Sequence, residues 1–265
     1  MVYLADRAEG HLRNAEPAAA IRDAQLAQDL ADANPDGAEA QISVRAMLAG
    51  IDGLALADRL DEAESLAVEA VTEATLFCDR GRWHALAELR LSETLELQGR
   101  YRAAGEGFVK LEEGLPNSWG ADIKMWCANH MISTGLHSTD RALQDIGIQR
   151  GSEMRPLVDD ADQVASFLQW RGIAESRRFE PEKAERTFAE SFPLRDRTVR
   201  REVTKGFLLA DIAYAYGEQE KGDRLLQEAL DRARKAGLWG IHLTGLPRVP
   251  RLVNDGAQRR DVSVA

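Results

Sequence analysis

The stretch "GRYRAAGEGFVKLEEGLP", residues 99 to 116, contains the residues that decide the fold. Gly99 opens it, Tyr101 follows, and Ala104 and Phe108 stand four residues apart before Pro116 closes it. A spacing of four puts the alanine and the phenylalanine on one face of a helix. Alanine suits a position where two helices cross closely, phenylalanine fills the space against a neighbouring hairpin, and proline ends a helix. The stretch therefore predicts the second helix of a helical hairpin.

The rest of the chain has the same character. Apolar residues recur at spacings of three and four almost everywhere, and the short breaks between periodic stretches carry Gly, Pro, Asp or Ser. Aromatic residues make up 6% of the 265 residues and prolines number only 8, which disfavours a turn-rich β fold. We expect an all-α protein of about six antiparallel helix pairs. The second helices are expected to begin near Glu16, Asp61, Tyr101, Thr139, Pro181 and Gln219.

The landmarks of the opening stretch resemble the second half of a tetratricopeptide repeat (TPR), which ends in A-x3-F and then proline, with a period of about 34 residues. The segment "EKAERTFAESF" is similar through Ala184 and Phe188, with Leu168 and Gly172 at tight-packing positions ahead of it. Successive landmarks lie roughly 40 residues apart. The chain thus resembles a divergent bacterial-type TPR array with long helices, like those of signalling regulators. The expected repeats span 1–36, 37–81, 82–117, 118–155, 156–196 and 197–236, and a C-terminal cap and flexible tail span 237–265.

The resemblance implies a right-handed α-solenoid whose first helices form a concave groove that binds peptides or protein segments. In the family, fixed positions of the first helices supply this groove. The corresponding residues here are Glu9, Leu48, Asp52, Leu56, Leu89, Glu93, Glu96, Lys124, Cys127, Met131, Gln169, Ile173, Phe207, Asp211 and Tyr214. The Lys and Asn combination with which some family members clamp a C-terminal carboxylate is missing, which argues against that role.

The charge is unevenly distributed along the chain. The net charge is −10, and residues 1 to 135 hold 12 Lys and Arg against 23 Asp and Glu. Glu9, Asp52 and Glu93 recur at one position of successive first helices and are expected to form an acidic row in the groove. Such a row favours a basic or amphipathic protein or peptide segment, and disfavours direct binding of nucleic acid or of an anionic membrane. Reversing Asp52 and Glu93 to Lys is expected to leave folding intact and to weaken binding.

The segment "CANHMISTGLH" raises the hypothesis of a metal site or a nucleophile. Cys127 and His130 share a helix face, and His137 and Asp140 lie at the next turn. A structural zinc site needs four ligands, and a lone cysteine is commonly a small buried hydrophobe, so we expect no metal here and a packing role for His130. Asp159 and Asp160 form a carboxylate pair, which we interpret as a helix cap.

The run "RDRTVRRE", residues 195–202, lacks interleaved aromatic residues and is interpreted as a solvated hairpin junction. The chain contains no Gly-rich phosphate loop, no G-x-S-x-G and no H-E-x-x-H motif, so we expect no cofactor and no catalytic residues.

These observations favour a protein-interaction scaffold. Two alternatives stay open: a regulatory sensor whose groove takes a signalling peptide or small molecule, and an enzyme built on a TPR-like fold. No stretch approaches the ~20 apolar residues of a membrane span, and Cys78 and Cys127 are expected to be free thiols, which together suggest a cytoplasmic protein. The sequence leaves homodimerisation open.

Overall fold

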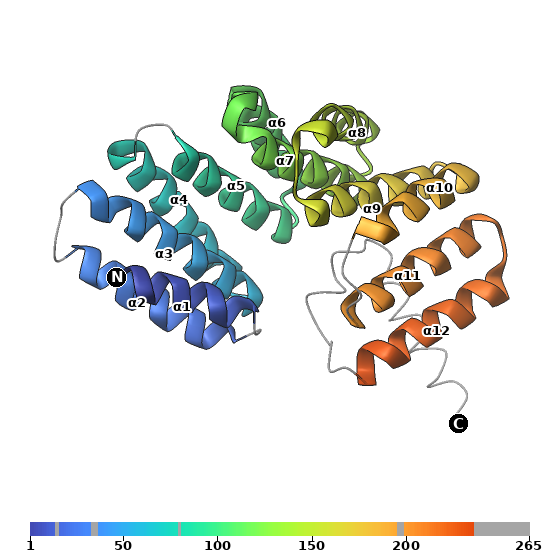
Figure 1. Cartoon of the computed structure of the whole chain (residues 1–265), viewed down its shortest axis with the longest axis horizontal. Helices are drawn as coiled ribbons and strands as arrows, with labels where there is room; N and C mark the ends of the chain where they lie inside the picture. The colour runs from blue at the N-terminus through green and yellow to red at the C-terminus, as the bar shows by residue number, and fades with distance from the viewer. Residues whose placement is uncertain (14–15, 33–36, 79–80, 195–198, 236–265) are drawn as a thin grey trace. The chain divides into compact units, whose positions relative to one another are not determined.

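The computed structural model describes residues 1–13, 16–32, 37–78, 81–194 and 199–235. Within these ranges the chain forms twelve α-helices and two 3-10 helices and contains no β-strand (Figure 1), which confirms the all-α class. The α-helices are α1 (Val2–Arg13), α2 (Pro17–Asp32), α3 (Gly37–Leu56), α4 (Leu60–Phe77), α5 (Arg82–Leu97), α6 (Tyr101–Gly114), α7 (Asn117–Ser138), α8 (Arg141–Met154), α9 (Ala161–Arg177), α10 (Pro181–Ser191), α11 (Val199–Ala215) and α12 (Gln219–Lys235). The 3-10 helices η1 (Arg155–Leu157) and η2 (Phe192–Leu194) follow α8 and α10. The expected cap and tail at 237–265 and residues 195–198 of the basic run lie outside the described residues.

The second helices of the pairs begin within two residues of the predicted positions. Proline occupies the first position of α2 and α10, where the missing N–H group would have had no partner within the helix. The predicted cap is confirmed at Asp160, whose carboxylate accepts hydrogen bonds from the backbone N–H groups of Asp162 and Gln163 at 2.8 and 3.2 Å. Asp140 caps α8 in the same way. The helix boundaries therefore follow from local chemistry.

Five of the hairpin turns contain a residue in the left-handed backbone conformation. A residue with positive φ stands between the two helices of five pairs, and these residues are Asp58, Gly99, Thr139, Phe179 and Gly217. At Gly99, for example, the N–H group donates to the carbonyl of Glu96 and the next N–H donates to that of Leu95, both at 2.9 Å. This pattern is the Schellman motif, and the turns at Asp58, Phe179 and Gly217 repeat it. Its left-handed residue costs glycine nothing but strains residues with a Cβ.

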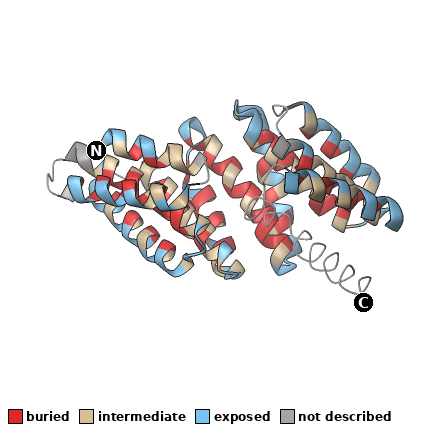
Figure 2. Ribbon diagram, turned by 90° about the horizontal axis from the view of Figure 1, so that it is seen from below, coloured by how far each residue is buried: buried red, intermediate tan, exposed pale blue. Residues whose placement is uncertain are grey.

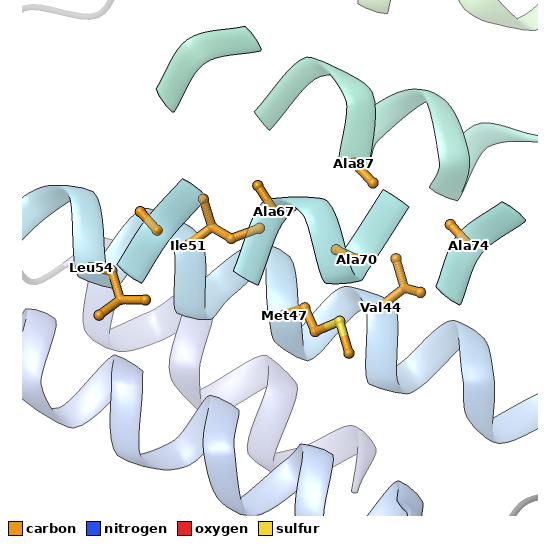
Figure 3. Packing of buried hydrophobic residues seen from close by; sticks show 9 residues of the cluster. Val44, Met47, Ile51, Leu54, Ala67, Ala70, Ala74 and Ala87 are labelled. Carbon is orange, nitrogen blue, oxygen red and sulfur yellow. The ribbon is translucent and has the colours of Figure 1, made fainter. Parts of the chain in front are cut away.

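The chain folds as two compact units, Met1–Thr134 and Gly135–Ala265. In each unit the buried residues lie on helix faces that are turned toward neighbouring helices (Figure 2). In the first unit the core is a seam of large residues on α3 against small ones on α4 (Figure 3). Helix α3 contributes Val44, Met47, Ile51 and Leu54, and α4 contributes Ala63, Ala67, Ala70 and Ala74. Because alanine adds so little bulk, the two helices of this pair can approach closely.

The opening stretch forms α6 as predicted. Ala104 and Phe108 have no exposed surface, and the Phe108 ring stacks on His130 of α7 with ring centroids 5.0 Å apart. Phe108 thus contacts the next hairpin, and His130 has the expected packing contact.

The second unit uses glycine for the same close packing. A Cβ on Gly172 of α9 would collide with the ring of Phe188 on α10, and a Cβ on Gly151 of α8 would collide with the ring of Phe167 on α9. Both phenylalanines are fully buried. The tight-packing role predicted for Gly172 is therefore confirmed, and the landmark phenylalanine Phe188 fills the space beside it. The core between α11 and α12 consists of Val203, Phe207, Ala210, Leu226, Ala229 and Ala233.

Candidate functional site

The first helices of successive pairs lie beside one another in the first unit. Helix α1 contacts α3, and α3 contacts α5. In the second unit α9 contacts α11. The predicted groove residues therefore fall on neighbouring helices within each unit (Figure 1).

Burial divides the predicted groove residues into two groups. Those with remaining exposed surface are Glu9, Leu48, Asp52, Leu56, Glu93, Glu96, Gln169 and Tyr214. Those buried are Leu89, Lys124, Cys127, Met131, Ile173, Phe207 and Asp211. The members of the second group pack between helices; Phe207, for instance, belongs to the α11–α12 core. The aromatic ring of Tyr214 lies against Gly222 of α12, and its hydroxyl donates to Asp223 at 2.9 Å.

The carboxylates on the first helices of the first unit are joined to arginines of neighbouring first helices. Between α1 and α3, Arg45 forms ion pairs with Asp6 and Glu9, with N–O distances of 2.7 Å for both. Between α3 and α5, Nε of Arg90 lies 2.8 Å from Oδ1 of Asp52. Each of these pairs crosses from one repeat to the next.

Arg90 also pairs within its own helix, because Nη1 donates to Oε2 of Glu93. Glu93 in turn connects α5 to α7. Its Oε1 accepts a hydrogen bond from the indole N–H of Trp126 at 2.6 Å and lies 2.9 Å from Nε2 of His130. The other ring nitrogen of His130, Nδ1, lies 2.7 Å from Oε2 of Glu96. We call this group the charge cluster; its members are Asp52, Arg90, Glu93, Glu96, Trp126 and His130.

The electrostatics of the cluster favour the charged forms of His130 and Glu93. Burial alone would lower the pKa of His130, but the negative charges of Glu96 and Glu93 outweigh burial and raise that pKa to about 10. Burial would raise the pKa of Glu93, but Arg90 and His130 lower it to about 2. At neutral pH the histidine is therefore an imidazolium that bridges two carboxylates.

Asp52 behaves differently. Burial raises its pKa to about 6, and the nearby charge of Glu93 adds to this shift, although Arg90 acts in the opposite direction. Asp52 therefore binds its proton more tightly than an ordinary aspartate does. Its side chain keeps 36% of its surface exposed, so a partner or solvent can reach it.

Glu96 has one unsatisfied oxygen. Its side chain is only 10% exposed, and Oε1 is buried and accepts no hydrogen bond from any described residue. A buried acceptor without a donor costs roughly 1–3 kcal/mol, and more when it carries charge. Glu96 is therefore the one carboxylate of the charge cluster for which the described residues leave a buried oxygen without a partner.

Sequence reasoning missed the arginines. It predicted an acidic row of Glu9, Asp52 and Glu93, and it did not foresee that each of these carboxylates pairs with Arg45 or Arg90. A signal was present, since Arg90 precedes Glu93 by three residues, the spacing of neighbours on a helix face. The expectation that Glu93→Lys leaves folding intact also changes, because a lysine there would face Arg90 and His130.

Among the described residues, the region of Cys127, His130 and His137 shows no metal-binding geometry. The described residues include no group of three His, Cys, Asp or Glu side chains placed to hold an ion. Both ring nitrogens of His130 face carboxylates, and burial, with the charge of Glu93 next, raises the pKa of the Cys127 thiol. The absence of a metal stays a prediction.

In the described part of the chain, no helix combines the length and apolar character needed to cross a bilayer.

Solved structures that are similar to this chain include the following two. The apo form of RapI superposes with a TM-score of 0.67 and 13% sequence identity, covering 90% of this chain and 86% of that one. BtubC from P. vanneervenii superposes with a TM-score of 0.63 and 16% identity, covering 88% of this chain and 94% of that one. No protein-family model and no curated protein sequence matches the chain. Identities this low establish the fold alone, and together with the hairpin landmarks they define a helical-repeat protein of TPR-like architecture.

Proposed function

We propose that this protein is a binding scaffold whose first-helix face takes a basic or amphipathic segment of a protein or peptide. The proposal rests on the band of half-buried charged side chains that runs over α1, α3, α5 and α7 in the first unit. Extended surfaces of stacked helical hairpins commonly serve to bind such segments. The groove residues of the first unit that keep exposed surface are the proposed contacts on that unit, and Gln169 and Tyr214 are the corresponding residues proposed for the second unit by itself.

The composition of the band supports the choice of partner. It contains five carboxylates, on Asp6, Glu9, Asp52, Glu93 and Glu96, against three cations, on Arg45, Arg90 and His130. The excess of negative charge attracts a basic segment and speeds its association at low salt. The half-buried side chains of Leu48 and Leu56 on α3 add apolar surface for the hydrophobic side of an amphipathic segment.

The test is selection of binders from a displayed library of 12-residue peptides, followed by affinity measurements on synthetic, fluorescein-labelled winners. The selected peptides should be enriched in Lys or Arg beside apolar residues, and their affinity should fall as salt increases. Replacing both Leu48 and Leu56 with Gln should weaken binding at least tenfold.

The matched control replaces two exposed leucines on a second helix, Leu26 and Leu30 of α2, with Gln. This variant should bind within about twofold of the unmodified chain, provided that circular dichroism shows both variants folded. Acidic consensus peptides, or equal losses in the two double variants, would contradict the proposal.

A further inference from the structure

A cavity of about 450 Å³ lies in the first unit between α4, α5 and α6, three helices that follow one another along the chain (Figure 1). The last turns of α4, the first turns of α5 and the end of α6 line it. Small-molecule sites usually have volumes of roughly 300–1,000 Å³, so the cavity has room for a small metabolite. None of the described residues that line it belongs to the predicted groove, and the cavity is therefore a site separate from the first-helix face.

The floor of the cavity is apolar. Ala85 of α5 and Leu111 and Leu115 at the end of α6 are buried and line it, and half-buried Val71 of α4 lines it as well. Space remains beside α6, because a Cβ placed on Gly114 would meet no other part of the chain within 4 Å. An apolar side chain that leaves water for this floor gains free energy in proportion to the area that it buries.

Two opposite charges line the same cavity without contacting each other. Glu88 lies on α5 and Lys110 on α6. Oε2 of Glu88 lies 3.6 Å from Nδ1 of His84, which is too far for a good hydrogen bond. No described residue forms an ion pair with the ammonium of Lys110. The cavity therefore presents one acceptor of a cation and one donor to an anion beside an apolar floor.

We propose that this cavity binds a free α-amino acid with an apolar side chain. The ammonium of the ligand donates to the carboxylate of Glu88, its carboxylate accepts from the ammonium of Lys110, and its side chain lies on the apolar floor. Charge-assisted hydrogen bonds of this kind are stronger than neutral ones. An apolar anion would leave Glu88 facing it without compensation, and an internal residue of a peptide carries neither terminal charge. The inference goes beyond the proposed function, because it assigns a small-molecule site away from the first-helix face.

The experiment compares four probes of graded chemistry: L-phenylalanine, N-acetyl-L-phenylalanine, L-phenylalanine amide and glycine. The acetyl group removes the ammonium, the amide removes the carboxylate, and glycine removes the side chain. Titrations at pH 6, where free α-amino groups are protonated, follow the backbone amide resonance of Gly114 in the full chain by NMR. L-phenylalanine should give a saturable shift of this resonance, and each of the other three probes should bind at least tenfold more weakly.

Two charge variants assign the contacts. Lys110→Gln should weaken binding of L-phenylalanine at least tenfold and remove its advantage over the amide. Glu88→Gln should likewise remove its advantage over the N-acetyl compound. Arg102→Gln is the matched control for lost charge on α6 and should leave binding unchanged, because Arg102 does not line this cavity and pairs with Glu106 at 3.0 Å.

A steric variant tests the location without changing charge. Gly114→Leu should fill the cavity with little disturbance of the fold, since the space beside Gly114 is open, and should abolish binding. Undiminished binding of L-phenylalanine by this variant, once circular dichroism shows it folded, would overturn the inference. Equal binding of L-phenylalanine and its amide or N-acetyl derivative to the unmodified chain would overturn it too, as would the absence of a saturable shift at millimolar L-phenylalanine.

Discussion

At the scale of single residues, His130 combines ring stacking with two ion pairs. The sequence suggested a choice between a metal ligand and a packing residue, and the structure gives it two other contacts beside the stacking on Phe108. Its ring nitrogens face Glu93 and Glu96, so that one imidazolium joins α7 to two carboxylates of α5. A buried charge of this kind stabilises the fold only while its partners remain, since each would otherwise be left buried and unpaired.

We predict that His130→Phe destabilises the chain by about 2–3 kcal/mol near pH 6. The variant keeps an aromatic ring to stack on Phe108 but leaves Glu93 and Glu96 without their shared cation. The folded pKa of about 10 lies above the ordinary value, so the stabilisation by the charge is fully present below about pH 6.5 and is lost as the pH rises through 10.

Urea unfolding of both proteins at pH 6, 8 and 10 measures this difference. The gap in the free energy of unfolding should narrow toward pH 10. His84→Phe is the control and should show a small effect, because His84 lies 3.6 Å from its one carboxylate partner, Glu88. A gap that is constant from pH 6 to pH 10 would mean that the contribution of His130 is packing and not charge.

At the scale of elements, five hairpin turns place a residue at a similar positive φ, but the type of residue at that position differs from turn to turn. Gly99 and Gly217 occupy the left-handed position without strain, at φ 76° and 77°. Phe179 holds the equivalent position of the α9–α10 turn at φ 60°, and its side chain is 83% exposed. A bulky residue there is strained and gains little from burial.

We predict that Phe179→Gly stabilises the chain by about 0.5–1 kcal/mol, because relief of the left-handed strain exceeds the added entropy of glycine in the unfolded state. Gly99→Ala should have the opposite effect, a loss of about 1 kcal/mol. Thermal unfolding of the two variants beside the unmodified chain tests both. A destabilised Phe179→Gly would show that the exposed ring contributes contacts that outweigh its backbone strain.

At the scale of the whole molecule, the chain consists of two units that each hold their own core. In repeat proteins the stability is approximately a sum of local and nearest-neighbour contributions. Phe108 in the first unit and Phe188 in the second are both fully buried, and both fill space beside a small residue or a neighbouring hairpin. Substituting each of them in turn therefore tests how far the loss of structure extends from a cavity in one unit.

We predict that Phe108→Ala and Phe188→Ala each cost about 3–5 kcal/mol, and that the loss of hydrogen-exchange protection stays within the unit that carries the substitution. Phe108→Ala should expose amides of α5, α6 and the first part of α7, and Phe188→Ala those of α9 and α10. Hydrogen exchange followed by mass spectrometry resolves these segments. Loss of protection over the full chain in either variant would indicate a single cooperative unit.

The sequence by itself determined the helices, their pairing and their close-packed positions. Each of these depends on residues a few positions apart: Ala104 and Phe108 lie one turn apart on α6, and Pro181 begins α10. Periodicity of three and four, helix caps and turn residues act over distances that a single stretch of sequence contains. For this reason the all-α fold and the starts of the second helices could be predicted.

Only the tertiary structure decided which charges meet and which predicted groove residues remain accessible. Glu9 pairs with Arg45 and Asp52 with Arg90, partners that are 36 and 38 positions apart, and Glu93 and Glu96 meet His130 on another helix. Such contacts depend on how neighbouring hairpins are rotated and shifted against one another, to within an ångström or so at the scale of a hydrogen bond. The sequence carries the residue types, but the register of the stacked helices decides that the carboxylates of the predicted acidic row form ion pairs with Arg45 and Arg90.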